Sequence, residues 1–185
     1  MRLAIVVGHR EHAQGATAVD GSREWAHHRV LADQIAAYAT AAGHDVRVFL
    51  RPDIQGYAKP LAVLVGQVNA YMPELVIALH FDAALVDFKG VWRGTSGRYW
   101  PGSKAGKMWA VQLSAAVSQA QGTRNRGAVA QAVSSSGKTL YVLRDTRAPA
   151  VIVETHFGDH PEDHRRALSA RDSGATAQAI VGVLS

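Results

Sequence analysis

Three apolar runs of the sequence end in side chains that can bind a metal or transfer a proton: His9, His80 and Glu154. A fourth polar group, Glu24, follows His9 by 15 residues. Two imidazoles and one carboxylate are the ligand set of a catalytic zinc ion, which keeps its fourth position for water. A nearby carboxylate that does not bind the metal can act as general base. We therefore predict that His9, Glu24 and His80 bind zinc and that Glu154 is the catalytic carboxylate.

Each of these residues also has a simpler interpretation. A single His or Glu after a strand commonly marks the point where the chain reaches solvent, and a carboxylate in the first turn of a helix is stabilised by the helix dipole. Glu24 can join the others only if the loop over 10–23 folds back toward the same edge, which Gly15 and Gly21 make feasible. No HExxH helix is present, so the arrangement is not that of thermolysin.

The elements that must position these residues follow from the apolar pattern. Short runs rich in branched residues predict buried strands. They are Leu3–Val7, Val46–Leu50, Leu75–Phe81, Ala150–Val153 and, more weakly, Leu140–Leu143. Helical spacing predicts helices between these runs. The first begins at an N-cap Ser22 and ends at Gly43, and the second covers about Lys59–Tyr71 before Pro73. The third starts at Ser103, with Trp109, Leu113 and Val117 on one face, and one or two further helices follow from about Pro161.

Apolar strands that alternate with helices indicate a largely parallel sheet covered on both faces. We predict an α/β fold: a single domain over residues 1–185 with a central, mostly parallel, twisted sheet of about five to six strands. Ligands gather beyond the carboxyl ends of the strands in such sheets. The Gly- and Ser-rich segment 121–138 is predicted to be a mobile loop over a cleft.

Composition limits the classes of site and partner. The chain has 185 residues, no cysteine and nine histidines, so a transition-metal site must use His and carboxylate ligands. A net charge of +5 favours anionic partners such as nucleic acid, an anionic membrane or a cell wall. No nucleic-acid-binding signature is present, so no nucleic-acid partner is expected. The other histidines are expected at the surface or behind the metal ligands, with His156 the most notable because it lies two residues past Glu154.

The sequence also gives expectations about localisation and oligomeric state. The apolar run before Gly8 has five residues, shorter than the roughly 7–15 of a signal-peptide core. No stretch approaches the ~20 apolar residues of a membrane span. We expect no signal peptide, synthesis in the cytoplasm, action on the wall after release or export, and a monomer.

The sequence resembles the zinc-dependent N-acetylmuramoyl-L-alanine amidases, which occur as bacterial autolysins and phage endolysins. The resemblance lies in three ordered motifs and covers about residues 3–163. They are Ile5-Val-Val-Gly-His9 followed by Gly-Ser-Arg-Glu24, then Val76-Ile-Ala-Leu-His80-Phe-Asp-Ala83, then Leu140-Tyr-Val-Leu-Arg144 with Ala148-Pro-Ala-Val-Ile-Val-Glu154. Two departures are an Arg-Glu-His loop after His9 in place of paired glycines, and Asp82 where the family commonly has Asn.

The resemblance implies an activity and assigns the same site residues. His9, Glu24 and His80 would bind Zn²⁺, and Glu154 would drive hydrolysis of the amide between N-acetylmuramic acid and L-alanine in peptidoglycan or muropeptides. Two alternatives stay open: a zinc peptidase of related fold that acts on ordinary peptides, and an inactive homologue that only binds peptidoglycan.

Overall fold

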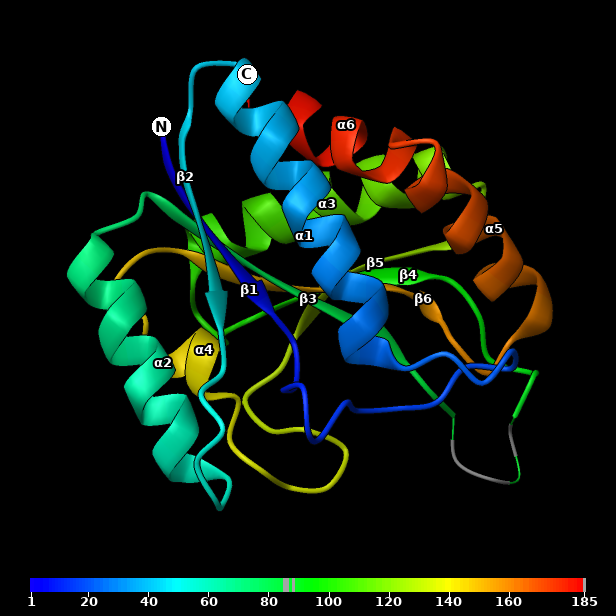
Figure 1. Ribbon diagram of the computed structural model, residues 1–185, viewed down its shortest axis with the longest axis horizontal. Coiled ribbons are helices and arrows are strands. Elements are labelled where there is room, and N and C mark those ends of the chain that lie inside the picture. Colours follow the sequence, from blue (N-terminus) through cyan, green and yellow to red (C-terminus); the bar gives the residue numbers. More distant parts are fainter. Residues whose placement is uncertain (85–86, 88, 185) are drawn as a thin grey trace.

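A six-stranded sheet covered by helices forms the protein (Figure 1). The structure is a computed structural model, and it describes residues 1–84, 87 and 89–184. The strands are β1 (Arg2–Val7), β2 (Asp45–Leu50), β3 (Leu75–Asp82), β4 (Thr95–Tyr99), β5 (Asn125–Ala130) and β6 (Ala150–Phe157). The helices are α1 (Glu24–Ala41), α2 (Ala58–Tyr71), α3 (Lys104–Gln121), α4 (Tyr141–Asp145), α5 (Pro161–Asp172) and α6 (Ala175–Gly182).

The strand order is β2-β1-β3-β6-β4-β5. The pairs β2·β1, β1·β3, β3·β6 and β4·β5 are parallel, and β4 runs antiparallel to β6. The carboxyl ends of β2, β1, β3 and β6 therefore lie side by side along one edge of the sheet. The predicted α/β class, with a mostly parallel sheet of five to six strands and helices on both faces, is confirmed.

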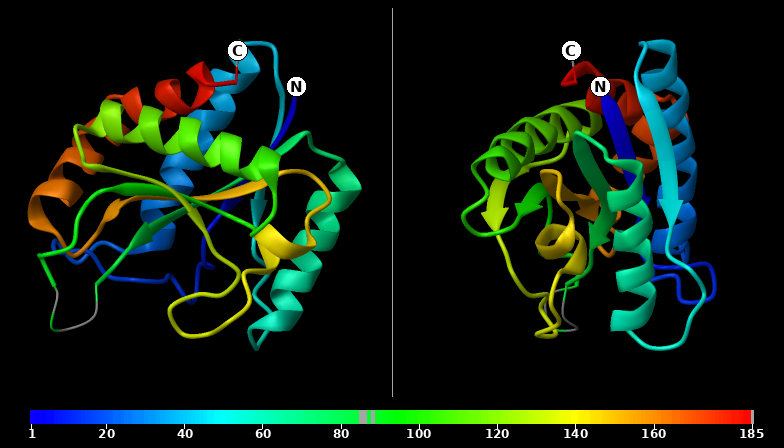
Figure 2. Two further views of the ribbon diagram at one scale, coloured as in Figure 1. Left: turned by 180° about the vertical axis from the view of Figure 1, so that it is seen from behind. Right: turned by 90° about the vertical axis from the view of Figure 1, so that its left-hand side faces the viewer.

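Alternate residues of the central strands pack into two separate cores. Leu3 and Ile5 of β1 pack with α1, α3 and α6 on one face, whereas Ala4 and Val6 pack with α2 and α4 on the other. Figures 1 and 2 show α2 and α4 on the opposite side of the sheet from α1, α3 and α6. A strand buried on both faces reads as a continuous apolar run, which is why β1, β3 and β6 were recognisable.

Three sequence predictions need correction. The weak strand at Leu140–Leu143 is wrong, because Tyr141–Asp145 forms the helix α4, whose Val142 and Leu143 pack against α2. The segment 121–138 is not all loop, because it contains β5. The cap of α1 is Arg23 rather than Ser22, and it has no side-chain capping hydrogen bond.

Two strands, β4 and β5, were not predicted from the sequence. Their segments read Thr-Ser-Gly-Arg-Tyr and Asn-Arg-Gly-Ala-Val-Ala, which lack an apolar run. They form the outer part of the sheet, so β5 is half exposed and needs few apolar side chains. Among the described residues, no helix is both long and apolar enough to cross a membrane.

Candidate functional site

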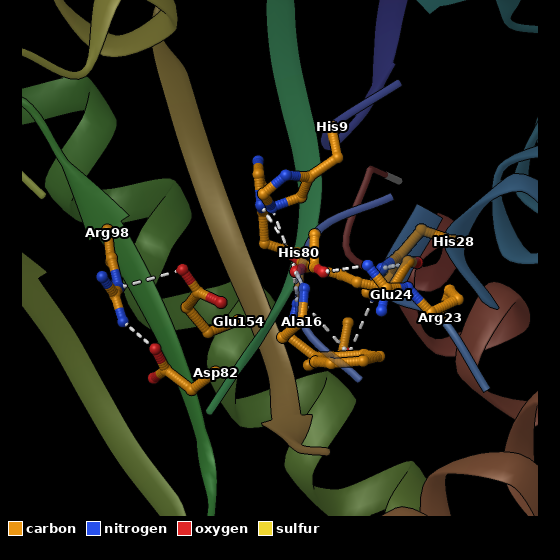
Figure 3. A network of polar contacts seen from close by, with 12 residues as sticks. His9, Ala16, Arg23, Glu24, His28, His80, Asp82, Arg98 and Glu154 are labelled. Atoms are coloured by element: carbon orange, nitrogen blue, oxygen red, sulfur yellow. Dashed lines mark hydrogen bonds and ion pairs between the residues drawn. The ribbon is translucent and has the colours of Figure 1, made fainter. Parts of the chain in front are cut away.

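His9, Glu24 and His80 meet at the carboxyl edge of the sheet (Figure 3). Each offers one potential ligand atom, and these atoms all lie within 4.8 Å of one another. The His9 Nε2 atom is 3.0 Å from Glu24 Oε2, and the His80 Nδ1 atom is 2.9 Å from Glu24 Oε1. Ligands bound tetrahedrally to zinc at 2.0–2.1 Å lie about 3.3 Å apart. The donor set and its spacing therefore fit a zinc ion.

The loop over 10–23 places Glu24 at this edge. The backbone N–H groups of Glu24 and Trp25 donate to the carbonyls of Ala16 and Gln14, at 3.1 and 3.0 Å, so the start of α1 folds back onto the loop. The Ala16 N–H in turn donates to Glu24 Oε2 at 3.0 Å, and the Phe81 N–H donates to Oε1 at 3.2 Å. The fold-back that the functional interpretation of Glu24 required is present.

The charges of the group suit metal binding. Glu24 is only 2% exposed, and although burial acts to raise the pKa of its carboxyl, hydrogen bonds from His80 and His9 hold that pKa well below its ordinary value. Burial lowers the pKa of His80, which its hydrogen bond with Glu24 partly opposes. An ionised carboxylate beside a neutral imidazole is the protonation state that a metal ligand needs.

Two glycines give the ligands their close approach. A Cβ atom on Gly8 would lie 2.5 Å from the His80 ring, and a Cβ atom on Gly15 would lie 2.4 Å from Glu24 Oε2 and 2.5 Å from the His9 ring. Gly15 also has a φ of +77°, a conformation that favours glycine. Both glycines are therefore part of the structure of the site.

Replacing Gly15 by alanine is expected to weaken zinc binding by about tenfold or more, because the new methyl group must displace the carboxylate or the imidazole that holds the ion. Gly21→Ala is the matched control: it lies in the same loop with a φ of +84°, but no atom of the residues that the structure describes lies within 4 Å of its Cβ position. Both variants should lose about 1–2 kcal/mol of unfolding free energy from backbone strain. Zinc titration with a competing chelator measures the difference, and equal zinc affinities in the two variants would contradict the expectation.

Glu154 lies beside the metal-ligand group on the neighbouring strand. Its Cα is in register with that of His80 in the β3·β6 pair, and its side chain is 7% exposed. Figure 3 shows its carboxylate between Arg98 on one side and the Glu24 and His80 group on the other. The Arg98 Nε atom is 3.3 Å from Glu154 Oε1.

A pair of arginines and an aspartate surround this carboxylate. Asp82 forms ion pairs with Arg98 and, at 2.9 Å, with Arg126. Burial, followed by the charge of Asp82, raises the pKa of Glu154 well above its ordinary value, and Arg98 acts in the opposite direction. A carboxylate whose pKa is raised toward neutral pH is a more effective general base.

A cleft of about 710 Å³ opens over both groups. The metal-ligand group and Glu154 line it together with residues from the segment 134–138, so part of the predicted loop does lie over the cleft. A cavity of this size accommodates a ligand of several hundred daltons. The structure thus brings all four predicted site residues into one cleft, and their chemical roles remain predictions.

Comparison with known proteins gives the family. Residues 3–185 match the N-acetylmuramoyl-L-alanine amidase family. The chain belongs to this family. A curated but uncharacterised protein of Clostridium perfringens is 30% identical over 165 residues, which cover 89% of this chain and 46% of that protein. The chain therefore spans about half the length of this curated relative.

Solved structures of amidases share the fold. The catalytic domain of the CD27L endolysin, which targets Clostridia difficile, superposes with a TM-score of 0.82 at 26% identity, covering 98% of this chain and 94% of that one. An N-acetylmuramoyl-L-alanine amidase from Clostridium difficile 630 superposes with a TM-score of 0.80 at 20% identity, covering 99% and 94%. At 20% identity, the second comparison shows a shared fold alone.

The two arginines beside Glu154 and Asp82 were not assigned to the site from the sequence. Arg98 lies on β4, a strand without an apolar run, and Arg126 lies on β5 in the segment predicted to be a loop. The available signal was Asp82, which stands where the family commonly has Asn. A carboxylate largely shielded from solvent, as Asp82 is, is commonly paired with a cation, so the departure could have prompted a search for one.

A chain of buried hydrogen bonds lies behind the candidate site. His28 Nδ1 donates to the Glu24 carbonyl at 3.0 Å, and His28 Nε2 lies 3.1 Å from the Thr155 hydroxyl, which donates to the His80 carbonyl at 3.2 Å. The chain continues from Thr155 Oγ1 to His156 Nδ1 at 2.9 Å and from His156 Nε2 to His164 Nδ1 at 3.1 Å. These contacts connect the first turn of α1, which carries Glu24, to the strand that carries Glu154.

His27 completes this buried cluster. Its ring centroid is 4.9 Å from that of His28 and 5.1 Å from that of His156. Arg171 can only donate, so His27 Nδ1 accepts from it at 3.2 Å and the ring proton is on Nε2, which has no hydrogen-bond partner among the described residues. Burial lowers the pKa of His27, His28 and His156 well below the ordinary value. The sequence predicted that the other histidines lie either at the surface or behind the metal ligands, and these three lie behind the ligands.

Stability should fall in acid because of these neutral histidines. Their folded-state pKa values are lowered, so the stabilisation is complete above the unfolded-state pKa of about 6.5 and is lost as the pH falls below it, by up to about 1.4 kcal/mol per pH unit for each histidine. In metal-free protein, His27→Phe should reduce the dependence of the unfolding free energy on pH by the contribution of one histidine, up to about 1.4 kcal/mol per pH unit. His12→Gln, at an exposed position, should leave this dependence unchanged. Denaturant unfolding between pH 7.5 and 5.5 measures the slope, and a slope in His27→Phe equal to that of the wild type would refute the expectation.

Proposed function

We propose that the protein hydrolyses the amide that joins the lactyl group of N-acetylmuramic acid to L-alanine in peptidoglycan. The observation that carries the proposal is the convergence of His9, Glu24 and His80 within 4.8 Å, beside an uncoordinated Glu154, in a chain of the amidase family. His9, Glu24 and His80 would hold the metal. A bound zinc ion supplies Lewis acidity, which activates water at neutral pH and polarises an amide carbonyl.

Glu154 transfers a proton from the attacking water to the leaving amine. It accepts a proton from the attacking water as the water oxygen bonds to the lactyl carbonyl carbon, and it delivers that proton to the departing alanine nitrogen as the C–N bond breaks. The products are a lactyl carboxylate and a free α-amino group. Arg98, 3.3 Å from Glu154 Oε1, holds the carboxylate in place for both transfers.

The test is to identify the chain ends that the protein produces. Purified protein with added zinc is incubated with peptidoglycan and, in parallel, with an ordinary peptide, each with and without a chelator. The proposal expects new L-alanine amino termini and intact glycan chains by mass spectrometry, and loss of both products with chelator. Cleavage of ordinary peptide bonds would favour the zinc peptidase, and binding to peptidoglycan without new ends would favour an inactive homologue.

A further inference from the structure

The carboxyl edge of the sheet carries a second set of charges beside the metal ligands. Arg51 follows β2, His9 follows β1, His80 lies in β3 and Glu154 lies in β6, in the spatial order of these parallel strands. The metal ligands therefore lie between Arg51 and the proposed base. Neighbouring strands are about 4.8 Å apart, so the end of β2 is one strand spacing from that of β1 and two from that of β3.

The Arg51 end of the cleft is cationic. Arg10, Arg51 and Lys138 all line the cleft, and Tyr57 lies among them. The Lys138 Nζ atom lies 4.9 Å from the centroid of the Tyr57 ring. Burial, with a contribution from the Arg10 guanidinium, lowers the pKa of Arg51, so two like charges share this part of the cleft.

These cations have little compensation within the chain. Arg51 Nε is buried and has no hydrogen-bond partner, and Arg51 and Lys138 have no ion pair, among the described residues. The Arg10 guanidinium is 3.2 Å from the Asp53 carboxylate. The Asp53 side chain is 54% exposed, so solvent screens this ion pair and it stabilises Arg10 only weakly. A half-buried guanidinium whose buried Nε donor is unused, beside a second guanidinium, is a site for an anionic ligand.

The carboxylates of the cleft cannot supply that anion. Glu24 accepts hydrogen bonds from the metal-ligand histidines and two backbone N–H groups. Asp82 is paired with Arg98 and Arg126, and Glu154 is paired with Arg98. Glu24 acts on Arg51 through its charge alone, so the unpaired Nε donor of Arg51 is open to an anionic group of the substrate.

We propose that Arg51, together with Arg10 and Lys138, binds a carboxylate of the peptide part of the substrate, one or two residues beyond the scissile amide. An extended residue spans about 3.3–3.6 Å and a strand spacing about 4.8 Å, so one or two residues, together with the reach of their side chains and of the long Arg51 side chain, cover the one or two strand spacings between the metal ligands and Arg51. The proposal rests on the proposed function and adds a substrate class to it: stem peptides with a free carboxylate on the second residue, D-glutamate, rather than the amide of D-isoglutamine.

The experiment compares substrates that differ only in this charge. The first pair is N-acetylmuramoyl-L-alanyl-γ-D-glutamyl-L-lysine and its D-isoglutamine counterpart, in which the γ-carboxyl is bonded to lysine and the α-carboxyl is an amide. The second pair carries D-isoglutamine followed by either diaminopimelate or lysine, so that only the third residue gains a carboxylate. We expect kcat/KM to be about tenfold or more higher for the acid of the first pair. Equal rates in the first pair, with or without a preference in the second pair, would overturn the assignment to the second residue.

Variants connect the preference to the cationic residues. Arg51→Gln should bring the acid-to-amide ratio of kcat/KM close to one. Lys138→Gln should lower the ratio by about threefold, and because the Lys138 side chain is exposed, its replacement should not unfold the protein. Lys107→Gln removes the same charge from an exposed position outside the cleft and should leave the ratio unchanged. An unchanged ratio in both Arg51→Gln and Lys138→Gln would overturn the assignment.

A binding measurement separates this inference from the proposed function. Isothermal titration calorimetry with L-alanyl-γ-D-glutamyl-L-lysine and its D-isoglutamine counterpart needs no turnover. Tighter binding of the acid by the wild type, lost in Arg51→Gln, supports the subsite even if no muropeptide is cleaved, in which case only the proposed function fails. Equal binding of the two peptides overturns the subsite even if the amidase activity is present.

Discussion

Replacing Glu154 by glutamine is expected to lower kcat for muropeptide hydrolysis by about 10²- to 10⁴-fold while zinc binding is retained. Glutamine has nearly the shape of glutamate but cannot accept the proton of the attacking water. The predicted metal ligands lie elsewhere, with His9 after β1, Glu24 in α1 and His80 in β3, so they keep their positions. Steady-state kinetics on a soluble muropeptide, together with zinc content by mass spectrometry, measures the two effects separately.

The matched control is Glu11→Gln, which removes the same charge from an exposed side chain that does not line the cleft. It should keep both kcat and zinc. Wild-type lysis of purified peptidoglycan by Glu154→Gln would show that another group takes the proton. The assignment of Glu154 as base would then be withdrawn, although the metal site could stand.

Replacing His80 by alanine is expected to remove both the metal and the activity. His80 supplies one of three ligand atoms, and its Nδ1 also contacts Glu24 Oε1 at 2.9 Å, so its loss disturbs a second ligand. Zinc affinity should fall by more than the roughly 10- to 100-fold that the loss of an outer hydrogen-bond partner costs. Competition with a chromogenic chelator measures the affinity, and the lysis assay measures the activity.

His12→Ala provides the control for this substitution. His12 lies three residues after His9, is exposed, and lies 3.7 Å from the exposed Asp53. Its removal should change neither zinc affinity nor lysis. If His80→Ala bound zinc as tightly as His12→Ala, the ion would have to lie elsewhere and the whole site would need reassignment.

The two predictions together separate the function of the metal from that of the base. Glu154→Gln should give a zinc-loaded protein without turnover, and His80→Ala a protein without either. A chelator should reproduce the second result in the wild type, and added zinc should reverse it. The Gly15→Ala variant is expected between these extremes, because its methyl group displaces ligands without removing one.

The sequence by itself determined the central sheet and the four residues of the candidate site. Strands β1, β3 and β6 are buried on both faces, so each needs a continuous apolar run, and such a run is visible without the fold. His9, His80 and Glu154 follow or interrupt these runs, and parallel neighbours bring such positions to one edge. The family motifs pointed to the same residues, with Glu24 added across the loop.

Only the tertiary structure decided what surrounds those four residues. Arg126 lies on β5, whose edge position removes the need for an apolar pattern, and Arg98 lies on β4, an inner strand whose buried residues are the small Thr95, Ser96 and Gly97. The buried histidine chain also depends on packing, because α1, β6 and α5 must come together before His28, His156 and His164 can bond. Short-range patterns report which side chains are buried, whereas contacts between polar residues distant in the chain leave no periodic signal, so they appear only once the elements are placed in space.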